Sequence, residues 1–324
     1  MIALALPWLL VLLLLLTLFF AYNKRWLLCL GCVFLILVGN IWGEVFAVNL
    51  RLFANKPDKN LPKLKILSWN VNGGELDSIS NCKLFHIIDS LSPDIIFLSE
   101  NYGQVNGLLD HKLASVKLKR ADYPGDNGHW FYSRIPIKKV EVMTSKIDSL
   151  AFLVKCKAVF DGSDIVIYGV HLSSNNFNRD RGYVPTDSIC TGWSVIDYLK
   201  RIRNASRLRV EEAEFICSDM QYEPAPVLVV GDMNDVSFSD CIRTLENAGL
   251  KDAWWSGGFG YGATINQPLP YRIDHIMYSS PFCLHSIKVI DSYGLSDHNA
   301  LYAELLIKEQ NNHTNEIFNC SCAP

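Results

Sequence analysis

Polar residues that can bind a metal ion or move a proton recur at the ends of apolar stretches in this sequence. A carboxylate, a carboxamide or an imidazole closes six separate stretches. An Asn-Gly or Asp-Asn pair in such a place often only makes a turn or a cap, so each position has a structural explanation of its own. Together they predict that the strand ends converge on one rim and build a catalytic site there. These residues are Asn70, Asn72, Glu100, His171, Asp232, Asn234, Asp274, Asp297 and His298.

The apolar stretches themselves have the length and composition of β-strands. They predict strands over 65–69, 95–98, 130–132, 152–160, 165–170, 227–230, 273–278, 287–290 and 300–306. Helical spacing of apolar residues predicts helices over 82–91, 205–217 and 241–248. Asp161-Gly162 lies between two of the strands and favours a tight hairpin with antiparallel pairing. Strands that alternate with helices predict an α+β sandwich in which helices cover two sheets.

Seven short segments resemble those of the endonuclease/exonuclease/phosphatase family and occur in the family's order. The resemblance covers about Lys65 to Leu306 and is consistent with a membrane-anchored, bacterial-type member. It implies a four-layered α/β/β/α sandwich with two mostly antiparallel central sheets, and a hydrolase acting on phosphate esters. The segments are Ser68 to Gly73, Pro93 to Glu100, Tyr132 to Ile137, Gly169 to Leu172, Gly231 to Asn234, Arg272 to Ile276 and Ser296 to His298.

The same resemblance implies a Mg²⁺ or Mn²⁺ site in which Glu100 is the main ligand, with Asn70 beside it and Asp297 near the same ion. Mg²⁺ prefers oxygen ligands, takes one or two carboxylates and keeps several waters, so a sparse site completed by substrate phosphate agrees with these residues. Asn72 stands where many family members have an aspartate and brings no negative charge. Metal binding is therefore expected to depend on Glu100.

The catalytic residues implied by the resemblance are His171, Asp232, Asn234, Asp274 and His298. Asp232 would orient or deprotonate the attacking water, and Asn234 would hold the phosphate or the water in line. Asp274 would fix the tautomer of His298 and raise its basicity, so that His298 stabilises charge on the phosphoryl oxygens. His171 would contact the phosphate or protonate the leaving oxygen.

Two apolar runs precede this domain. The run from Ile2 to Tyr22 has no charged residue and is long enough to cross a bilayer as a helix. A second run from Trp26 to about Leu50 is interrupted only by Asn40 and Glu44. Together they predict a transmembrane hairpin at residues 1–50. A cleaved signal peptide is the alternative, but the first run lacks a basic leader and a second run follows at once.

The expected organisation is the hairpin, a linker at 51–64, a catalytic domain at 65–308 and a flexible tail at 309–324. Lys24 and Arg25 favour a cytoplasmic turn, whereas five basic residues between Arg51 and Lys65 favour the opposite orientation. The shortness of the turn favours an extracytoplasmic catalytic domain on an inner or plasma membrane protein. Scattered cysteines are expected to be small buried apolar residues.

The substrate class stays open between nucleic acid and a phospholipid or inositol phosphate. The chain has 30 basic and 33 acidic residues, so charge alone does not favour nucleic acid. Basic residues in 173–209 and aromatic residues in 254–261 could stack on and neutralise a nucleic acid. Alternatively, Arg203, Arg207 and Glu211 form a solvated helix face, and the aromatic residues pack on their own sheet or dip toward the bilayer. The third reading is a non-catalytic phosphate-binding membrane module; no protein partner is predicted.

Overall fold

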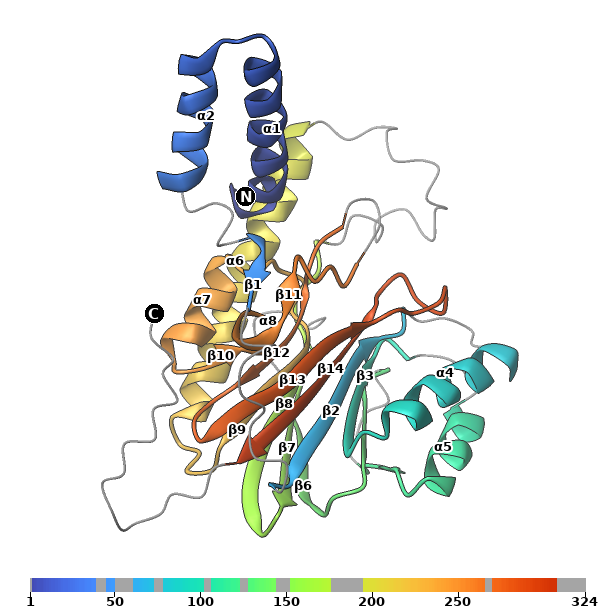
Figure 1. The fold of residues 1–324 in the computed structure, drawn as a ribbon. Coiled ribbons are helices and arrows are strands. Elements are labelled where there is room, and N and C mark those ends of the chain that lie inside the picture. The colour runs from blue at the N-terminus through green and yellow to red at the C-terminus, as the bar shows by residue number, and fades with distance from the viewer. Residues whose placement is uncertain are drawn as a thin grey trace.

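The computed structural model describes residues 2–38, 45–49, 61–72, 78–101, 106–122, 128–143, 152–175, 195–265 and 270–307 (Figure 1). Two six-stranded sheets form its centre. The first, the β2 sheet, contains in order β13 (Phe282–Ile290), β14 (Ala300–Ile307), β2 (Lys63–Asn70), β3 (Ile95–Ser99), β5 (Trp130–Ser133) and β4 (Lys119–Arg120). The second, the β9 sheet, contains β10 (Lys251–Asp252), β12 (Asp274–Tyr278), β9 (Val227–Asp232), β8 (Ser163–His171), β7 (Phe152–Phe160) and β6 (Ile137–Met143).

Both sheets are mixed. The pairs β2–β3 and β8–β9 are parallel, and the other neighbours in each sheet are antiparallel. Asp161 and Gly162 make the predicted tight turn between β7 and β8, with φ of 49° and 76°. Positive φ at both central residues of a two-residue loop is the geometry that fits the twist of a hairpin.

The helices cover the outer faces of the sheets. Ile66 and Phe97 face the inner core between the sheets, whereas Leu67 and Leu98 face α4 (Ser78–Leu91) and α5 (Asn106–Ser115). The β9 sheet packs its other face on α6 (Val195–Met220) and α7 (Asp240–Asn247). Successive strand residues point to opposite faces, so strands buried on both sides are continuously apolar. The predicted sandwich of helix, sheet, sheet and helix layers is present.

Two glycines allow close approach at one end of the core, where Asn70, His171 and Asp232 lie. A Cβ on Gly169 would lie 2.5 Å from the ring of Phe97 on the facing sheet. Gly231 has φ of 140°, and a Cβ there would lie 2.0 Å from the carbonyl oxygen of Val170 on the neighbouring strand. Gly169 therefore lets the two sheets approach each other, and Gly231 lets the neighbouring strands that carry His171 and Asp232 do so.

Two apolar helices form the N-terminal hairpin. α1 (Ile2–Tyr22) has 21 residues and, by length and composition, could cross a membrane. α2 (Trp26–Val38) covers 13 residues of the second apolar run, and residues 39–44 of that run lie outside the described residues. Later in that run, β1 (Ala47–Val48) is a short strand that pairs with β11 (Phe259–Gly260) of the domain.

The hairpin packs directly on the domain. Leu10 and Leu13 of α1 form a buried cluster with Val45, Val236 and Phe238, called here the hairpin contact. Trp8 Nε1 also donates a hydrogen bond to the hydroxyl of Tyr271, at 2.9 Å.

The basic residues in 173–209 and the aromatic residues in 254–261, which could contact a substrate, lie partly in the described chain and partly outside it. Arg207 and Glu211 form an exposed pair at 3.7 Å on α6, as the solvated-face alternative predicts. Trp254, in α8 (Ala253–Gly257), is buried in the inner core, so this aromatic side chain packs on its own sheet. Phe259 is exposed. Arg179 and Arg181, residues 51–60 of the linker and the tail at 309–324 lie outside the described residues.

Candidate active site

Strand register brings three predicted residues side by side at one end of the β9 sheet. His171 ends β8 and is the register partner of Asp232 at the end of β9. Asp274 opens β12 and pairs with Asp232 from the other side. Asp232 is thus flanked by both residues. Its side chain is 1 % exposed, so its charge interacts with neighbouring groups rather than with water.

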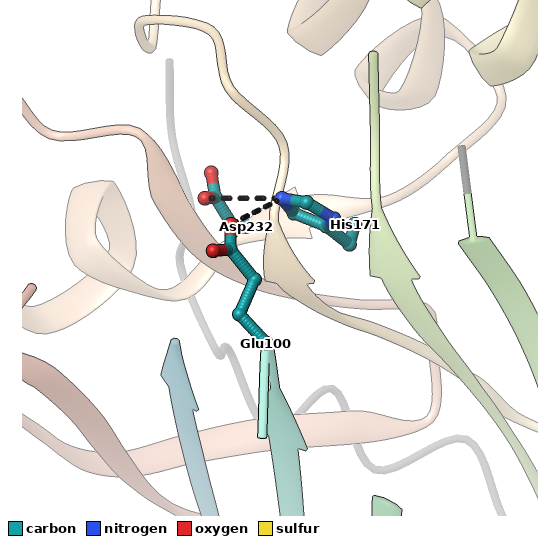
Figure 2. A group of neighbouring side chains, drawn as sticks. All are labelled: Glu100, His171 and Asp232. Atoms are coloured by element: carbon teal, nitrogen blue, oxygen red, sulfur yellow. Dashed lines mark ion pairs between the residues drawn. The ribbon is translucent and has the colours of Figure 1, made fainter. Parts of the chain in front are cut away.

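The β2 sheet contributes Asn70 and Glu100 to the same place. Asn70 ends β2, and its amide Nδ2 donates to Glu100 Oε1 and to Asp232 Oδ2, both at 3.0 Å. His171 Nε2 lies 3.0 Å from Glu100 Oε1 and 3.9 Å from Asp232 Oδ2 (Figure 2). One carboxamide therefore joins carboxylates from the two sheets, and one imidazole faces both.

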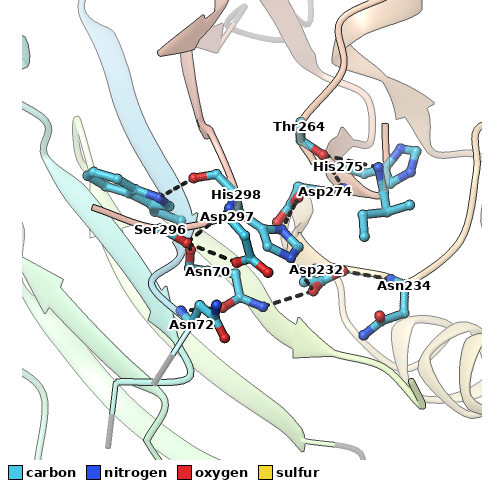
Figure 3. A network of polar contacts seen from close by, with 12 residues as sticks. Asn70, Asn72, Asp232, Asn234, Thr264, Asp274, His275, Ser296, Asp297 and His298 are labelled. Carbon is cyan, nitrogen blue, oxygen red and sulfur yellow. Dashed lines mark hydrogen bonds and ion pairs between the residues drawn. The ribbon is translucent and has the colours of Figure 1, made fainter. Parts of the chain in front are cut away.

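His298 and Asp274 form a buried pair beside Asp232 (Figure 3). His298 Nδ1 lies 2.8 Å from Asp274 Oδ2, while His298 Nε2 faces Asp232 Oδ2 at 3.9 Å. Thr264 Oγ1 accepts hydrogen bonds from the backbone amides of Ile273 and Asp274, which fixes the start of β12. Trp69 Nε1 donates to the carbonyl of His298 at 3.0 Å. The pair is held from both sheets.

These contacts shift the pKa values of the site. Burial opposes the charge of Glu100, but the hydrogen bond and charge of His171 and the Asn70 amide lower the pKa of Glu100 to about 2. Burial likewise opposes charge on His298, but Asp274 and Asp232 raise its pKa to about 10. For Asp232, burial and the nearby Asp274 carboxylate raise the pKa, against the opposing charges of His298 and His171. The site thus holds one strongly ionised carboxylate and one more basic carboxylate.

The remaining predicted residues lie around this centre. Asn234 has φ of 50°; its backbone amide donates to Asp232 Oδ1 at 2.8 Å and its side chain to the carbonyl of Leu172 at 2.9 Å. Asn72 donates its backbone amide to Asn70 Oδ1 at 2.9 Å, so it supports Asn70. Asp297 is exposed and lies next to Ser296, whose hydroxyl donates to the Asn70 carbonyl at 2.8 Å. Asp297 therefore stands at the mouth rather than within the buried cluster.

His129 is a neighbour that the sequence analysis does not identify. Its ring centroid lies 5.2 Å from that of His171, and its ring stacks on Phe97. Burial, followed by the charge of His171, lowers the pKa of His129 to about 3, so its ring is neutral. His129 precedes β5, whose first residue pairs with Leu98 at the site end of β3. His129 belongs to none of the short segments that carry the family resemblance, so no signal in the sequence marks it.

A buried ion-pair network supports the loops that carry the site. Arg209 of α6 donates to Asp235 Oδ2 and to the carbonyl of Ser173, both at 2.9 Å. These partners follow β9 and β8 respectively, so Arg209 ties together the loops after Asp232 and His171. A second buried group has Arg272 Nη1 at 2.9 Å and His275 Nδ1 at 2.8 Å from Asp252 Oδ2. None of these contacts follows from sequence spacing.

The donor set fits a divalent cation. One carboxylate oxygen each of Glu100 and Asp232 and a ring nitrogen of His171 lie within 4.8 Å of one another, as do ligand atoms of Asp232, Asp274 and His298. Glu100 is ionised, and its side chain is 26 % exposed, so it is reachable from solvent. Among the described residues, Asp274 Oδ1 is buried without a hydrogen-bond partner. Few carboxylates, a carboxamide and an open side are what Mg²⁺ or Mn²⁺ needs.

The fold and the site together define a class of protein. Residues 67–298 match the Endonuclease/Exonuclease/phosphatase family, and the chain belongs to that family. Its members are generally metal-dependent phosphoester hydrolases. No curated protein sequence matches the chain.

Solved structures share the fold at low identity. An endonuclease/exonuclease/phosphatase family protein from Bacteroides thetaiotaomicron has a TM-score of 0.55 at 17 % identity, over 77 % of this chain and 100 % of that one. The human Nocturnin catalytic domain with bound sulfate has a TM-score of 0.54 at 18 % identity, over 76 % of this chain and 96 % of that one. D. rerio TDP2 in complex with a single-strand DNA product has a TM-score of 0.52 at 19 % identity, over 75 % of this chain and 98 % of that one.

Proposed function

We propose that this chain is a membrane-anchored, divalent-metal-dependent phosphoesterase. It hydrolyses a phosphodiester or a phosphomonoester by in-line attack of an activated water. The first candidate activity is nuclease-like, with a phosphodiester of nucleic acid as the substrate. The observation that carries the proposal is the position of Asp232. It lies between His171 and Asp274 in one sheet and is joined by Asn70 to Glu100 of the other.

In this mechanism Asp232 takes the proton of the attacking water at its carboxylate. Burial beside Asp274 raises the pKa of Asp232, and a more basic carboxylate is a better general base near neutral pH. Asn234 is fixed by its bond to the Leu172 carbonyl and lines the path of the water or phosphate. Asp232 and Asn234 thus orient the nucleophile.

The two histidines stabilise charge on the phosphoryl group. Asp274 binds Nδ1 of His298, which directs Nε2–H of His298 toward the centre of the site. His171 directs Nε2 to the same region and can donate a proton to the leaving oxygen. Buried donors of this kind stabilise developing charge strongly because little water screens them.

Glu100 and Asn70 would hold the Mg²⁺ or Mn²⁺, with Asp297 at the mouth near the same ion. The cation supplies Lewis-acid stabilisation of the phosphoryl oxygens. Without it, the carboxylates gathered around Asp232 would repel an anionic substrate. Substrate binding is therefore expected to require the metal.

A lipid or inositol phosphate is the second candidate substrate. Its support is the hairpin contact, because Val236 and Tyr271 lie only a few residues from Asn234 and Asp274 and touch α1. Nucleic acid is supported by TDP2, a relative in fold that has been crystallised with a single-strand DNA product. We expect an integral membrane protein with its catalytic domain on the extracytoplasmic side.

Hydrolysis by the full chain in detergent micelles tests the proposal. With Mg²⁺, we expect cleavage of bis(p-nitrophenyl) phosphate, and loss of that cleavage in Glu100→Ala. Plasmid DNA and phospholipid vesicles then separate the substrate classes. If no phosphate ester is cleaved by a folded protein, the chain is a non-catalytic phosphate-binding membrane module.

A further inference from the structure

The candidate site lies at one end of the sandwich, called here the site end. The C-terminal ends of β2, β3, β8 and β9 and the N-terminal ends of β12 and β14 meet there. α1 packs on loops of the same end through Val236 and Phe238. Figure 1 shows the hairpin projecting from this end of the molecule.

α6 extends beyond the strand ends at the site end, the end from which the hairpin also projects. Arg209 contacts the loops after β8 and β9, so this residue marks the level of the strand ends. The helix begins 14 residues earlier at Val195, which is about 21 Å of α-helix. Figure 1 shows this first part of α6 extending to the same end of the molecule as the hairpin.

The first turns of α6 expose a mixed apolar and basic face. Ile196 and Leu199 are 63 % and 42 % exposed. The side chain of Lys200 is 68 % exposed and that of Arg207 is 72 % exposed. Positions separated by three, four, seven and eleven residues lie on one side of a helix. This α6 face therefore consists of Ile196, Leu199, Lys200, Arg203 and Arg207.

Other exposed apolar side chains of the domain gather at the same end. Val48 and Phe259 are register partners in the β1–β11 pair beside the hairpin and are 50 % and 65 % exposed. Tyr293, at 72 % exposed, lies in the loop between β13 and β14 that leads to His298. Phe46, which comes just before β1, is 41 % exposed. Away from this end and outside α1 and α2, the large apolar residues exposed in the described chain are Leu61, before β2, and Tyr222, after α6. The distribution is one-sided.

We infer that the site end faces the bilayer that holds the hairpin, and that the α6 face binds its anionic phospholipid headgroups. Exposed leucines on α1 show that this hairpin needs an apolar surrounding, and the α6 face continues that surface. Ile196 and Leu199 enter the interface at the tip of the helix. Lys200, Arg203 and Arg207 follow along the helix, where negative headgroups attract them. The contact holds the candidate site at the membrane surface whatever its substrate.

Hydrogen exchange of the full chain in nanodiscs tests this surface without reference to activity. One set of discs contains phosphatidylcholine alone and the other an equal mixture with phosphatidylglycerol. We expect the amides of the first turns of α6 to exchange more slowly in the anionic discs at low salt, and the difference to disappear at high salt. The three cations of the α6 face, at about 1 kcal/mol each, correspond to about 150-fold in binding to such a surface, which sets the largest slowing.

Matched double variants identify the groups responsible. Lys200→Gln with Arg203→Gln is expected to abolish the difference between the two kinds of disc. Lys138→Gln with Lys139→Gln removes the same charge from β6, which Figure 1 shows away from the hairpin, and is expected to keep the difference. Equal exchange in both discs for the parent chain, or equal loss in both variants, overturns the inference. Protection that appears in detergent and rises with protein concentration would assign the α6 face to a second copy of the chain.

Discussion

Replacing Asp274 with asparagine removes the negative charge that lies beside His298 and keeps the shape of the residue 274 side chain. Asp274 is 1 % exposed and lies 2.8 Å from His298 Nδ1, so its bond is charged and buried. A hydrogen bond to a charged group contributes about 1.5–3 kcal/mol, which corresponds to about 10- to 150-fold in rate if it forms fully in the transition state. We therefore expect Asp274→Asn to lower kcat within that range with little change in KM.

The assay is steady-state hydrolysis of bis(p-nitrophenyl) phosphate by the full chain with saturating Mg²⁺. Asp164→Asn is the control, because Asp164 forms an exposed pair with Lys138 and such pairs contribute little. Circular dichroism melting of each variant separates a lost catalytic contact from a lost fold. An unchanged kcat in a normally folded Asp274→Asn variant would refute the role given to the His298–Asp274 pair.

The other predictions concern the metal, the buried supports and acid stability. Chelation with EDTA is expected to abolish hydrolysis and added Mg²⁺ or Mn²⁺ to restore it. Glu100→Gln should raise the Mg²⁺ concentration for half-maximal rate by more than about 10-fold, because loss of a group that only supports a ligand already costs about 10- to 100-fold. Asp252→Ala leaves the buried Arg272 unpaired, which costs about 3–5 kcal/mol and should lower Tm by about 6–20 °C in differential scanning fluorimetry. Burial opposes the charge of Asp252, but Arg272 and His275 lower its pKa, so its stabilisation is complete above its unfolded pKa of about 3.9 and is lost as pH falls through the folded value. The difference in urea stability between the parent and Asp252→Asn should therefore narrow below about pH 4, and a constant difference would contradict this ion pairing.

Strands buried on both faces were predictable because their sequences are continuously apolar. β7 was expected over 152–160 and occupies Phe152–Phe160. β6 was not expected, since Lys138, Lys139 and Glu141 interrupt its apolar pattern. It lies at the edge of the β9 sheet, where charged residues protect an open strand from further pairing. An edge strand therefore lacks the continuous apolar sequence by which a central strand can be predicted.

The convergence of the predicted residues was foreseeable in outline, but the contacts among them were not. The polar residues Asn70, His171 and Asp232 mark strand ends that can share a rim. The bond from Asn70 to carboxylates of both sheets depends on how the sheets face each other, which no spacing in the sequence specifies. The same holds for Arg209, which is one of the basic residues of 173–209 expected to neutralise a nucleic acid but is buried between two loops.

The second apolar run shows the limit of composition. Apolar residues continue from Trp26 to about Leu50, yet Ala47 and Val48 form a strand with the domain. Hydropathy indicates that these side chains avoid water, but it does not distinguish burial in lipid from burial against protein. The pairing with Phe259 and Gly260 decides this through long-range contacts.

In the proposed mechanism Asp232 is the base of a single hydrolytic centre built from both sheets. Its most direct test is the rate of bis(p-nitrophenyl) phosphate hydrolysis by Asp232→Asn, measured in micelles with Mg²⁺ beside the parent chain. General-base catalysis contributes about 10²- to 10⁴-fold, and we expect a loss of that size with the fold retained. A folded Asp232→Asn variant that hydrolyses the ester as fast as the parent would contradict the account.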